Sequence, residues 1–562
     1  MKYFWLSFLF FVVAYLVPLG GRPLVPPDEF RYAEIPREMM DSGSYAAPHL
    51  LTVRYFEKPV LGYWMTAGSF KIFGQNAFAL RLPCALGAGL AAFLIFFLVN
   101  QTLRDDKLAA LASMLFLTSG LVYGVSTFAV LDSQTTGLIT GILVTSFLAV
   151  LEPGFTRRRV LLLALCGLFA GLAFMTKGFI AWVVPGLAMA GFLIWERRWK
   201  EFYLLPWIPA VVALVIVAPW ALAVHRAEPD YWNYFVMIEH VQRFTAKTEG
   251  QHPEPFWYYI PVLLGGVFPA AFLAPAAFAI GRKAWGKLLA QPLYRFCVCA
   301  AVLPFLFFSA SSGKLGTYIL PCFPPLAVLG AGAVACYFRA GDGRSRAFHR
   351  VMNFWGGALV LAGTGVLVIE LGGFESYFAE HRVLAVLTGA AGLVYGLALL
   401  LTAKQVWRVR LYIFFAGFAA VLALGGWAIP EGMIGDKMPE RALKQLPEKL
   451  GFDTRKAVLV THPAYMHAVA WVYHRPDVRS LNTVGELDYG DGEAEKRGEP
   501  RVFISTAELV KLLKKPGRPG VVYITRESRE FKLPEPFPHQ EAVIADMKAI
   551  YFPPLPVAEE VK

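Results

Sequence analysis

A dense cluster of acidic and basic residues follows directly on the first apolar segment of the chain. It occupies residues 26–39 and reads Pro-Pro-Asp-Glu-Phe-Arg-Tyr-Ala-Glu-Ile-Pro-Arg-Glu-Met. Asp28 and Glu29 stand at its start, at a predicted membrane boundary, where an unpaired carboxylate is costly and usually functional. A carboxylate there can orient an amine or hydroxyl, or steady a developing oxocarbenium charge. We therefore take Asp28 and Glu29 as catalytic candidates.

A plainer interpretation of this cluster stays open. Asp28 can be the N-cap of a helix over residues 29–42. The charges that follow would then be ordinary solvated helix charges. These are Glu34, Arg37, Glu38 and Asp41.

A second cluster, at residues 54–64, reads Arg-Tyr-Phe-Glu-Lys-Pro-Val-Leu-Gly-Tyr-Trp. Lys58 precedes a proline at the start of a second amphipathic helix, predicted over residues 58–73, and an ammonium beside a helix N-terminus favours a phosphate. We take Tyr55, Glu57 and Lys58 as candidates for binding a phosphate. The alternative is a lysine that snorkels to the membrane surface, with aromatic residues as interface anchors.

Isolated polar residues at other predicted span ends can join these clusters. Asp132 and Lys177 each stand at a span junction, and Arg243 lies in a second long loop. Lys314 and Tyr318 are predicted one helical turn apart at the start of a span. Two acids and up to four cations thus converge on one membrane face, which suits a negatively charged lipid phosphate. Each cation can instead anchor to lipid headgroups.

The elements that position these residues are membrane spans. The chain has 562 residues, 56% of them hydrophobic and 17% charged, and a mean hydropathy of +0.50. This composition excludes an ordinary globular or disordered protein. Thirteen apolar stretches approach the roughly 20 residues that a bilayer requires. They cover about residues 3–20, 78–100, 108–124, 134–151, 160–176, 178–195, 203–224, 258–280, 294–309, 315–337, 351–371, 382–402 and 411–429.

Every second loop between these spans is basic. Together with Lys2, these loops carry 19 Lys and Arg residues against six acids. The positive-inside rule places them and the N-terminus in the cytoplasm, and the opposite loops outside. The whole net charge of +12 lies in residues 1–429, so it reports topology and identifies no acidic partner.

The organisation predicted is a transmembrane domain over residues 1–429, with long periplasmic loops at 21–77 and 225–257, followed by a small periplasmic α/β domain over 430–562. Apolar runs shorten to strand length after Pro430, at 457–460, 502–505, 521–525 and 542–544, with helical patterns at 463–473 and 507–513 between them. Residues 485–500, rich in glycine and acids, are expected to form a surface loop. The six cysteines all fall within or at the ends of spans, which predicts no disulfide framework.

Three segments carry a family resemblance: residues 28–39, 55–64, and 311–321, the last reading Ser-Ser-Gly-Lys-Leu-Gly-Thr-Tyr-Ile-Leu-Pro. In this order they resemble the lipid A aminoarabinose transferases, ArnT-type members of the GT-C glycosyltransferases and relatives of protein O-mannosyltransferases. The resemblance implies a helical polytopic membrane protein of the GT-C fold, with about thirteen transmembrane helices and a C-terminal periplasmic α/β domain. It also implies a bacterial inner-membrane location.

The resemblance also implies an activity. The enzyme would move 4-amino-4-deoxy-L-arabinose from undecaprenyl phosphate to a phosphate of lipid A on the periplasmic face, giving resistance to polymyxin and other cationic peptides. Asp28 would be the main catalytic carboxylate, Tyr55 and Lys58 would hold the carrier phosphate, and Arg243 and Lys314 would add positive charge. Asp132 and Tyr318 follow as further site residues. The family allows a divalent metal ion, but no ligand cluster appears in this sequence, and no cofactor is assigned.

The mechanism expected is an inverting, direct displacement at the anomeric carbon. The partners expected are a polyprenyl-phosphate sugar donor, lipid A or another envelope acceptor, and membrane lipids, but no nucleic acid. Three alternatives stay open. They are the same fold moving galactosamine, mannose or another hexose to lipid A or protein, a polyprenyl-lipid transporter, and a scaffolding membrane protein.

Overall fold

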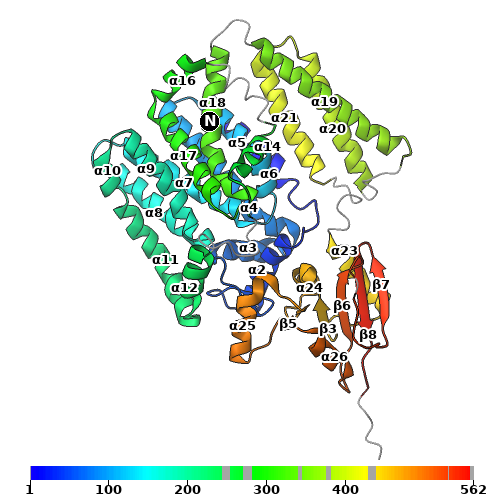
Figure 1. The fold of residues 1–562 in the computed structure, drawn as a ribbon. Helices are drawn as coiled ribbons and strands as arrows, with labels where there is room; N and C mark the ends of the chain where they lie inside the picture. Colours follow the sequence, from blue (N-terminus) through cyan, green and yellow to red (C-terminus); the bar gives the residue numbers. More distant parts are fainter. Residues whose placement is uncertain are drawn as a thin grey trace, which may run out of the picture. The chain divides into compact units, whose positions relative to one another are not determined.

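The structure is a computed structural model that describes residues 2–242, 253–269, 281–339, 345–374, 381–427, 438–529 and 531–556. The described residues form two compact units, whose elements are labelled in Figure 1. Unit 1 comprises Met1–Gly21, Arg81–Ser376 and His381–Ile429. Unit 2 comprises Arg22–Leu80, Tyr377–Glu380 and Pro430–Lys562. The domain division predicted at Pro430 stays a prediction.

Nine helices of the described ranges are long and apolar enough to cross a bilayer. They are α4 (Ala77–Leu103), α7 (Leu131–Leu151), α8 (Arg157–Lys177), α10 with α11 (Trp199–Leu204, Trp207–Ala227), α17 (Pro292–Ala310), η5 with α18 (Gly316–Cys322, Phe323–Arg339), α19 (Ser345–Leu371), α20 (Arg382–Leu401) and α21 (Trp407–Gly425). Their length and composition confirm the polytopic membrane fold.

The other predicted spans correspond to shorter or bent apolar helices. Helices α5 (Asp106–Leu117) and α6 (Gly120–Ser126) form one pair, bent by 65°. The shorter apolar helices are α1 with η1 (Lys2–Phe11, Val12–Leu16), α9 (Ile180–Trp195) and η3 with α14 (Phe256–Tyr258, Tyr259–Gly266). The stretch predicted over 258–280 is described only to residue 269. The remaining helices in the described ranges of unit 1 are α12 (Tyr231–Asn233), η2 (Tyr234–Gln242) and α16 (Gly281–Leu289).

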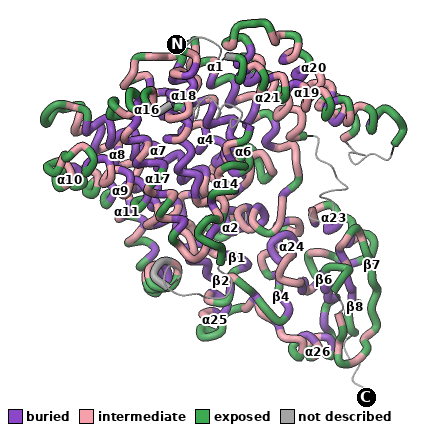
Figure 2. Tube along the Cα trace, turned by 45° about the horizontal axis from the view of Figure 1, so that its top comes forward, coloured by how far each residue is buried: buried purple, intermediate pink, exposed green. Residues whose placement is uncertain are grey.

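Helix α7 is the most buried of these helices, with 94% of its apolar stretch inside the protein. Its trace has the colour of buried residues in Figure 2. It packs tightly against α4, because a Cβ at Gly87 would lie 2.5 Å from the carbonyl oxygen of Ser133. Four hydroxyl side chains of α7, those of Thr135, Thr140, Thr145 and Ser146, donate to carbonyls of the same helix. Thr140, for example, donates to the carbonyl of Thr136 over 2.7 Å. The sequence starting at Leu131 thus places Asp132 at the first turn of a rigid, central helix.

The first part of unit 2 contains the two charged clusters. Helix α2 (Asp28–Ser42) ends at Gly43, whose φ of 71° suits a glycine C-cap. A short antiparallel hairpin, β1 (His49–Leu50) and β2 (Val53–Arg54), then leads to α3 (Leu61–Phe73). Both predicted helices are present, but α3 begins at Leu61, so Lys58 precedes it by three residues.

The second part of unit 2 is an α/β fold around a six-stranded sheet of order β5-β4-β3-β6-β8-β7. Strands β3, β4, β5 and β6 pair in parallel, and β8 runs antiparallel to both β6 and β7. The strands are β3 (Val458–Thr461), β4 (Arg479–Leu481), β5 (Phe503–Ile504), β6 (Val521–Arg526), β7 (Gln540–Ile544) and β8 (Met547–Phe552). The helices are α23 (Pro439–Leu450), η8 (Pro463–Tyr465), α24 (Met466–Tyr473), η9 (Gly485–Leu487), α25 (Asp488–Arg497) and α26 (Thr506–Lys514). The α/β class is confirmed.

One prediction for this fold is wrong. Residues 485–500 contain η9 and α25 where a surface loop was expected. Acids occupy the first turn of α25 and Lys496 and Arg497 its last, which complements the helix dipole, and Gly498 caps it with a φ of 67°. The charge placement at the two helix ends outweighs the low helix propensity of Gly490 and Gly492.

Candidate functional site

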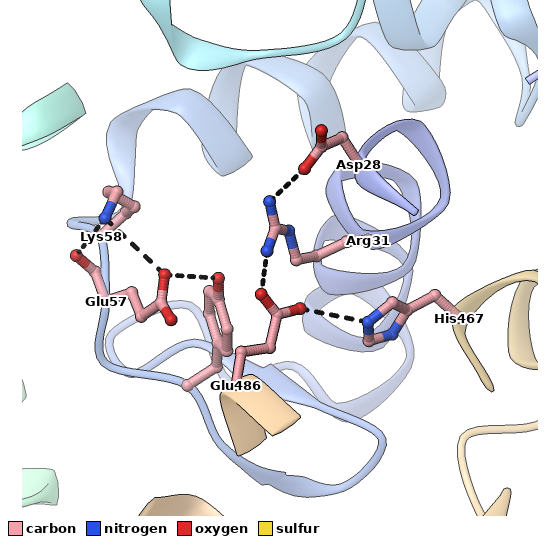
Figure 3. A network of polar contacts seen from close by, with 7 residues as sticks. Asp28, Arg31, Glu57, Lys58, His467 and Glu486 are labelled. Carbon is pink, nitrogen blue, oxygen red and sulfur yellow. Dashed lines mark hydrogen bonds and ion pairs between the residues drawn. The ribbon is translucent and has the colours of Figure 1, made fainter. Parts of the chain in front are cut away.

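Asp28 is the first residue of α2 and forms an ion pair one turn along the same helix. It follows Pro27, and no side chain caps the helix, so the interpretation of Asp28 as a cap is wrong. One carboxylate oxygen of Asp28 accepts a hydrogen bond from the Arg31 guanidinium, as Figure 3 shows. The Asp28 side chain is 40% exposed, so it remains accessible to a substrate.

Arg31 also reaches a carboxylate from the distant part of unit 2. Its second terminal nitrogen donates to Glu486 in η9, and the other oxygen of Glu486 lies 3.2 Å from Nε2 of His467 in α24. Burial alone would raise the pKa of Glu486, but the Arg31 charge and the His467 hydrogen bond hold it at about 2. Glu486 therefore stays ionised. The chain Asp28, Arg31, Glu486, His467 is continuous in Figure 3.

Glu29 has a different environment from its neighbour. Its side chain is fully buried. Its Oε2 accepts from Arg22 over 2.7 Å and from the backbone N–H of Val25 over 2.9 Å. These bonds tie the segment that enters α2 to the helix itself.

The second cluster forms a small polar network around Glu57. The hydroxyl of Tyr55 donates to Oε2 of Glu57 over 3.0 Å. Nζ of Lys58 lies 3.8 Å from the same oxygen and donates to the Glu57 carbonyl over 3.1 Å. Burial raises the pKa of Tyr55 well above its usual value, so its hydroxyl keeps its proton and acts as a donor. The structure thus brings all three candidates together, and Figure 3 shows Glu57 and Lys58.

Three of the four remaining charges of α2 are buried, namely Glu34, Arg37 and Glu38, so their interpretation as solvated helix charges is wrong, whereas Asp41 is exposed. Arg37 donates to Glu34 over 2.8 Å through Nε and to Asp41 over 2.6 Å. Glu38 accepts from the backbone N–H groups of Leu51 and Thr52 over 2.6 and 3.1 Å. Burial and the nearby Glu34 raise the pKa of Glu38 to about 8. These residues hold the hairpin against α2.

Unit 1 holds a separate group of candidate residues. Asp132 at the start of α7 forms a 2.6 Å ion pair with Lys177 at the end of α8. Nζ of Lys177 also lies 5.2 Å from the ring centre of Tyr318, within cation–π range. Asp132 and Tyr318 are therefore joined through Lys177, a cation that sequence reasoning noted but did not assign to the site.

Lys314 is almost fully buried and donates to backbone carbonyls, of Glu254 over 2.9 Å and of Ser311. The segment that follows is the 3-10 helix η5, which starts at Gly316, so Lys314 and Tyr318 are not one α-helical turn apart as predicted. Arg243 lies outside the described residues. That these residues line one site with those of unit 2 stays a prediction.

Arg31, Glu486 and His467 are the residues that sequence reasoning missed. The spacing of three from Asp28 on a helix was a usable signal for Arg31. No local signal marks Glu486 or His467, because they are more than 400 positions away along the chain. Within the described ranges, no three His, Cys, Asp or Glu side chains gather as a metal ion requires.

Two family profiles match the chain. The one described as "Dolichyl-phosphate-mannose-protein mannosyltransferase" matches residues 1–235. The one described as "Arabinosyl transferase ArnT, C-terminal domain" matches residues 434–552.

Similar proteins align over nearly the whole chain. A protein of Shewanella sediminis named "Undecaprenyl phosphate-alpha-4-amino-4-deoxy-L-arabinose arabinosyl transferase" is 37% identical over 538 residues, covering 94% of both chains. A protein of the same name from Aeromonas salmonicida is 39% identical over 489 residues, covering 86% of this chain and 87% of its own. A third, from Erwinia tasmaniensis, is 36% identical over 532 residues, covering 93% and 92%.

Solved structures share the fold. The crystal structure of ArnT from Cupriavidus metallidurans bound to undecaprenyl phosphate superposes with a TM-score of 0.77 at 22% identity, covering 98% of this chain and 97% of that one. The same protein in the apo state gives the same TM-score at 23% identity, covering 98% of each chain.

Proposed function

Because the chain belongs to the family of undecaprenyl phosphate-α-4-amino-4-deoxy-L-arabinose arabinosyl transferases, we propose that it moves this aminosugar from undecaprenyl phosphate to a phosphate of lipid A. It is a lipid-linked glycosyltransferase and a multi-pass protein of the inner membrane, with a polyprenyl-phosphate sugar as donor. The observation that carries this proposal is the 36–39% identity to curated relatives over most of the chain. The positive-inside rule supports a cytoplasmic N-terminus and a periplasmic C-terminal part.

The charge of the two substrates suits lipid A as the acceptor. A phosphate monoester is already anionic at neutral pH, so it needs little activation by a base. One of its oxygens attacks the anomeric carbon of the sugar while the bond from that carbon to the carrier phosphate breaks. The carrier phosphate leaves with the electron pair, and the configuration at carbon inverts. The product masks a negative charge of lipid A, which weakens the binding of polymyxin and other cationic peptides.

Asp28 is the carboxylate best placed to take part in this reaction. It is partly exposed and held by Arg31 in one orientation, with its second oxygen directed away from that ion pair (Figure 3). That oxygen can accept from the amino or hydroxyl groups of the sugar and steady the positive charge that develops at its ring. Glu29, by contrast, is buried against Arg22. We assign it the structural task of orienting the first turn of α2, although sequence reasoning grouped it with Asp28.

Lys58 and Tyr55 are the residues that we assign to the carrier phosphate. Glu57 lies beside both, and it orients the phenol and the ammonium before substrate binds. An incoming phosphate can take over both donors, because its charge is greater than that of a single carboxylate. Arg243 and Lys314 would add positive charge. Within unit 1, Asp132 is held by Lys177 next to Tyr318, and we keep Asp132 and Tyr318 as candidates for contact with the substrates.

The test is transfer by the purified, full-length protein in lipid nanodiscs. The donors are undecaprenyl phosphate carrying aminoarabinose, galactosamine or mannose, and the acceptors are lipid A and a dephosphorylated lipid A. We expect mass spectrometry to show the mass of aminoarabinose added to lipid A but not to dephosphorylated lipid A. Preferred transfer of a hexose, or equal transfer to the dephosphorylated lipid, would overturn the assigned sugar or acceptor.

A further inference from the structure

Arg31 is shared between two carboxylates that come from distant parts of unit 2. One terminal nitrogen donates to Asp28 on its own helix, and the other donates to Glu486 in η9. A guanidinium is a rigid planar fork, so fixing one of its nitrogens fixes the direction of the other. The contact with Glu486 therefore decides where Arg31 presents its other terminal nitrogen to Asp28.

Glu486 has a second partner in addition to Arg31. Its other oxygen lies 3.2 Å from Nε2 of His467, whose side chain is only 4% exposed. An ionised carboxylate has no proton to give, so Nε2–H of His467 is the donor. Among the described residues, Nδ1 of His467 has no hydrogen-bond partner, so the imidazole is committed to Glu486. Helix α24, which carries His467, packs on α2.

We propose that Glu486 and His467 are positioning residues for sugar transfer, which hold Arg31 and, through it, the catalytic carboxylate of Asp28. This inference rests on the proposed function. We call the hydrogen-bonded chain of Asp28, Arg31, Glu486 and His467 the relay. It starts at the first turn of α2 and ends in η9 and α24, so it gives the part of the chain after Pro430 a role in the reaction. Neither residue has to touch the sugar or the phosphates.

A second ion pair in unit 2 provides the matched control. Arg54 of β2 donates to Glu499 over 2.6 Å, so it also joins the first loop to the C-terminal residues. The side chain of Glu499 is 42% exposed, which is more than that of Glu486, and it contacts Arg54 and not Arg31. If such pairs serve only to dock the two segments, losing either one has the same effect. If the relay positions Asp28, only Glu486 matters for turnover.

The experiment compares Glu486→Gln and Glu499→Gln with the parent protein in the nanodisc transfer assay. We expect Glu486→Gln to lower kcat about 10- to 100-fold, the loss of one charge-assisted hydrogen bond, with little change in the KM for the lipid donor. Glu499→Gln should retain nearly normal kcat. Glu486→Asp keeps the negative charge but holds it on a shorter side chain, farther from Arg31. Its kcat should lie between those of Glu486→Gln and the parent protein. His467→Gln, which retains an N–H donor, should keep more activity than His467→Phe.

Double variants distinguish a positioning role of Glu486 from a contribution to stability alone. Arg31→Lys removes the forked guanidinium. The double variant with Glu486→Gln should therefore lose little more kcat than Arg31→Lys alone, whereas the kcat losses of Arg31→Lys and Glu499→Gln should add. Equal kcat losses in the two glutamine variants, or additive losses for Arg31→Lys with Glu486→Gln, would overturn the positioning role.

A structural measurement keeps this inference separate from the proposed function. If the parent protein transfers no aminoarabinose, the proposed function fails. An electron cryomicroscopy structure of the Glu486→Gln variant then still decides the relay. We expect the Arg31 guanidinium to leave its place between residues 28 and 486. An unmoved Arg31, with Asp28 in its original orientation, would refute the relay whatever the sugar.

Discussion

Glu38 makes the stability of the β1–β2 hairpin depend on pH. Its two oxygens accept the backbone N–H groups of Leu51 and Thr52, which are non-glycine residues with φ of 54° and 70°. Because φ is unfavourable there, these two bonds help to keep the turn in place. Truncation by Glu38→Ala leaves two donors without this acceptor, at a cost of roughly 1–3 kcal/mol each if water does not replace it.

The sign of the pH effect follows from the raised pKa of Glu38. Burial and Glu34 raise this pKa from 4.5 to about 8 in the folded protein. The folded state therefore binds the proton more tightly than the opened loop, and its stability is highest below pH 4.5. It falls as the pH rises towards 8, by at most about 1.4 kcal/mol per pH unit for one group. Glu38→Gln, which cannot ionise, should flatten this dependence.

Hydrogen exchange of the full-length protein in nanodiscs measures this effect locally. Protection factors of the Leu51 and Thr52 amides, corrected for the intrinsic rate at each pH, report the free energy of opening. We expect them to fall between pH 5 and 8 in the parent protein and to change much less in Glu38→Gln. The amide of Val502, bonded to Asp491 over 2.7 Å, is an internal reference. The same slope in parent and variant would refute the reasoning.

Three further predictions concern the assigned residues. Asp28→Asn and Lys58→Ala should each express well but lower the rate of sugar transfer by at least about 100-fold, because both groups stabilise charge that develops in the transition state. Normal transfer in a purified assay would disprove the site. Asp132→Asn should lower thermal stability because it leaves the ammonium of Lys177 without its carboxylate, and the double variant with Lys177→Met should recover part of that loss, measured by a fluorescence melting assay. Lys314→Met should lower the melting temperature because the backbone carbonyls of Glu254 and Ser311 lose their donor, and an unchanged melting temperature would show that water replaces the ammonium.

Apolar patterning predicted the helices well, because a helix in a membrane must satisfy its backbone internally and show apolar side chains to lipid. The charged clusters at 28–39 and 55–64 were found for a related reason, since charge next to an apolar span is conspicuous. Helix α25 was missed because its glycines weaken the helical pattern, and its stability depends on charges at its two ends. The start of α3 was misplaced by three residues because Pro59 fits either a first helical turn or the approach to one.

The sequence alone determined that this is a polytopic membrane protein with carboxylates and cations next to its apolar spans, since composition and span length depend only on which residues the chain has and on their order. Tertiary structure decided what those charges do. Asp28 and Glu29 are adjacent in sequence, yet one is open and shares Arg31 with Glu486, and the other is buried against Arg22. Lys314 is bound to backbone carbonyls. Such differences arise because the cost of a charge depends on its burial and its partners, and both are set by segments far away along the chain.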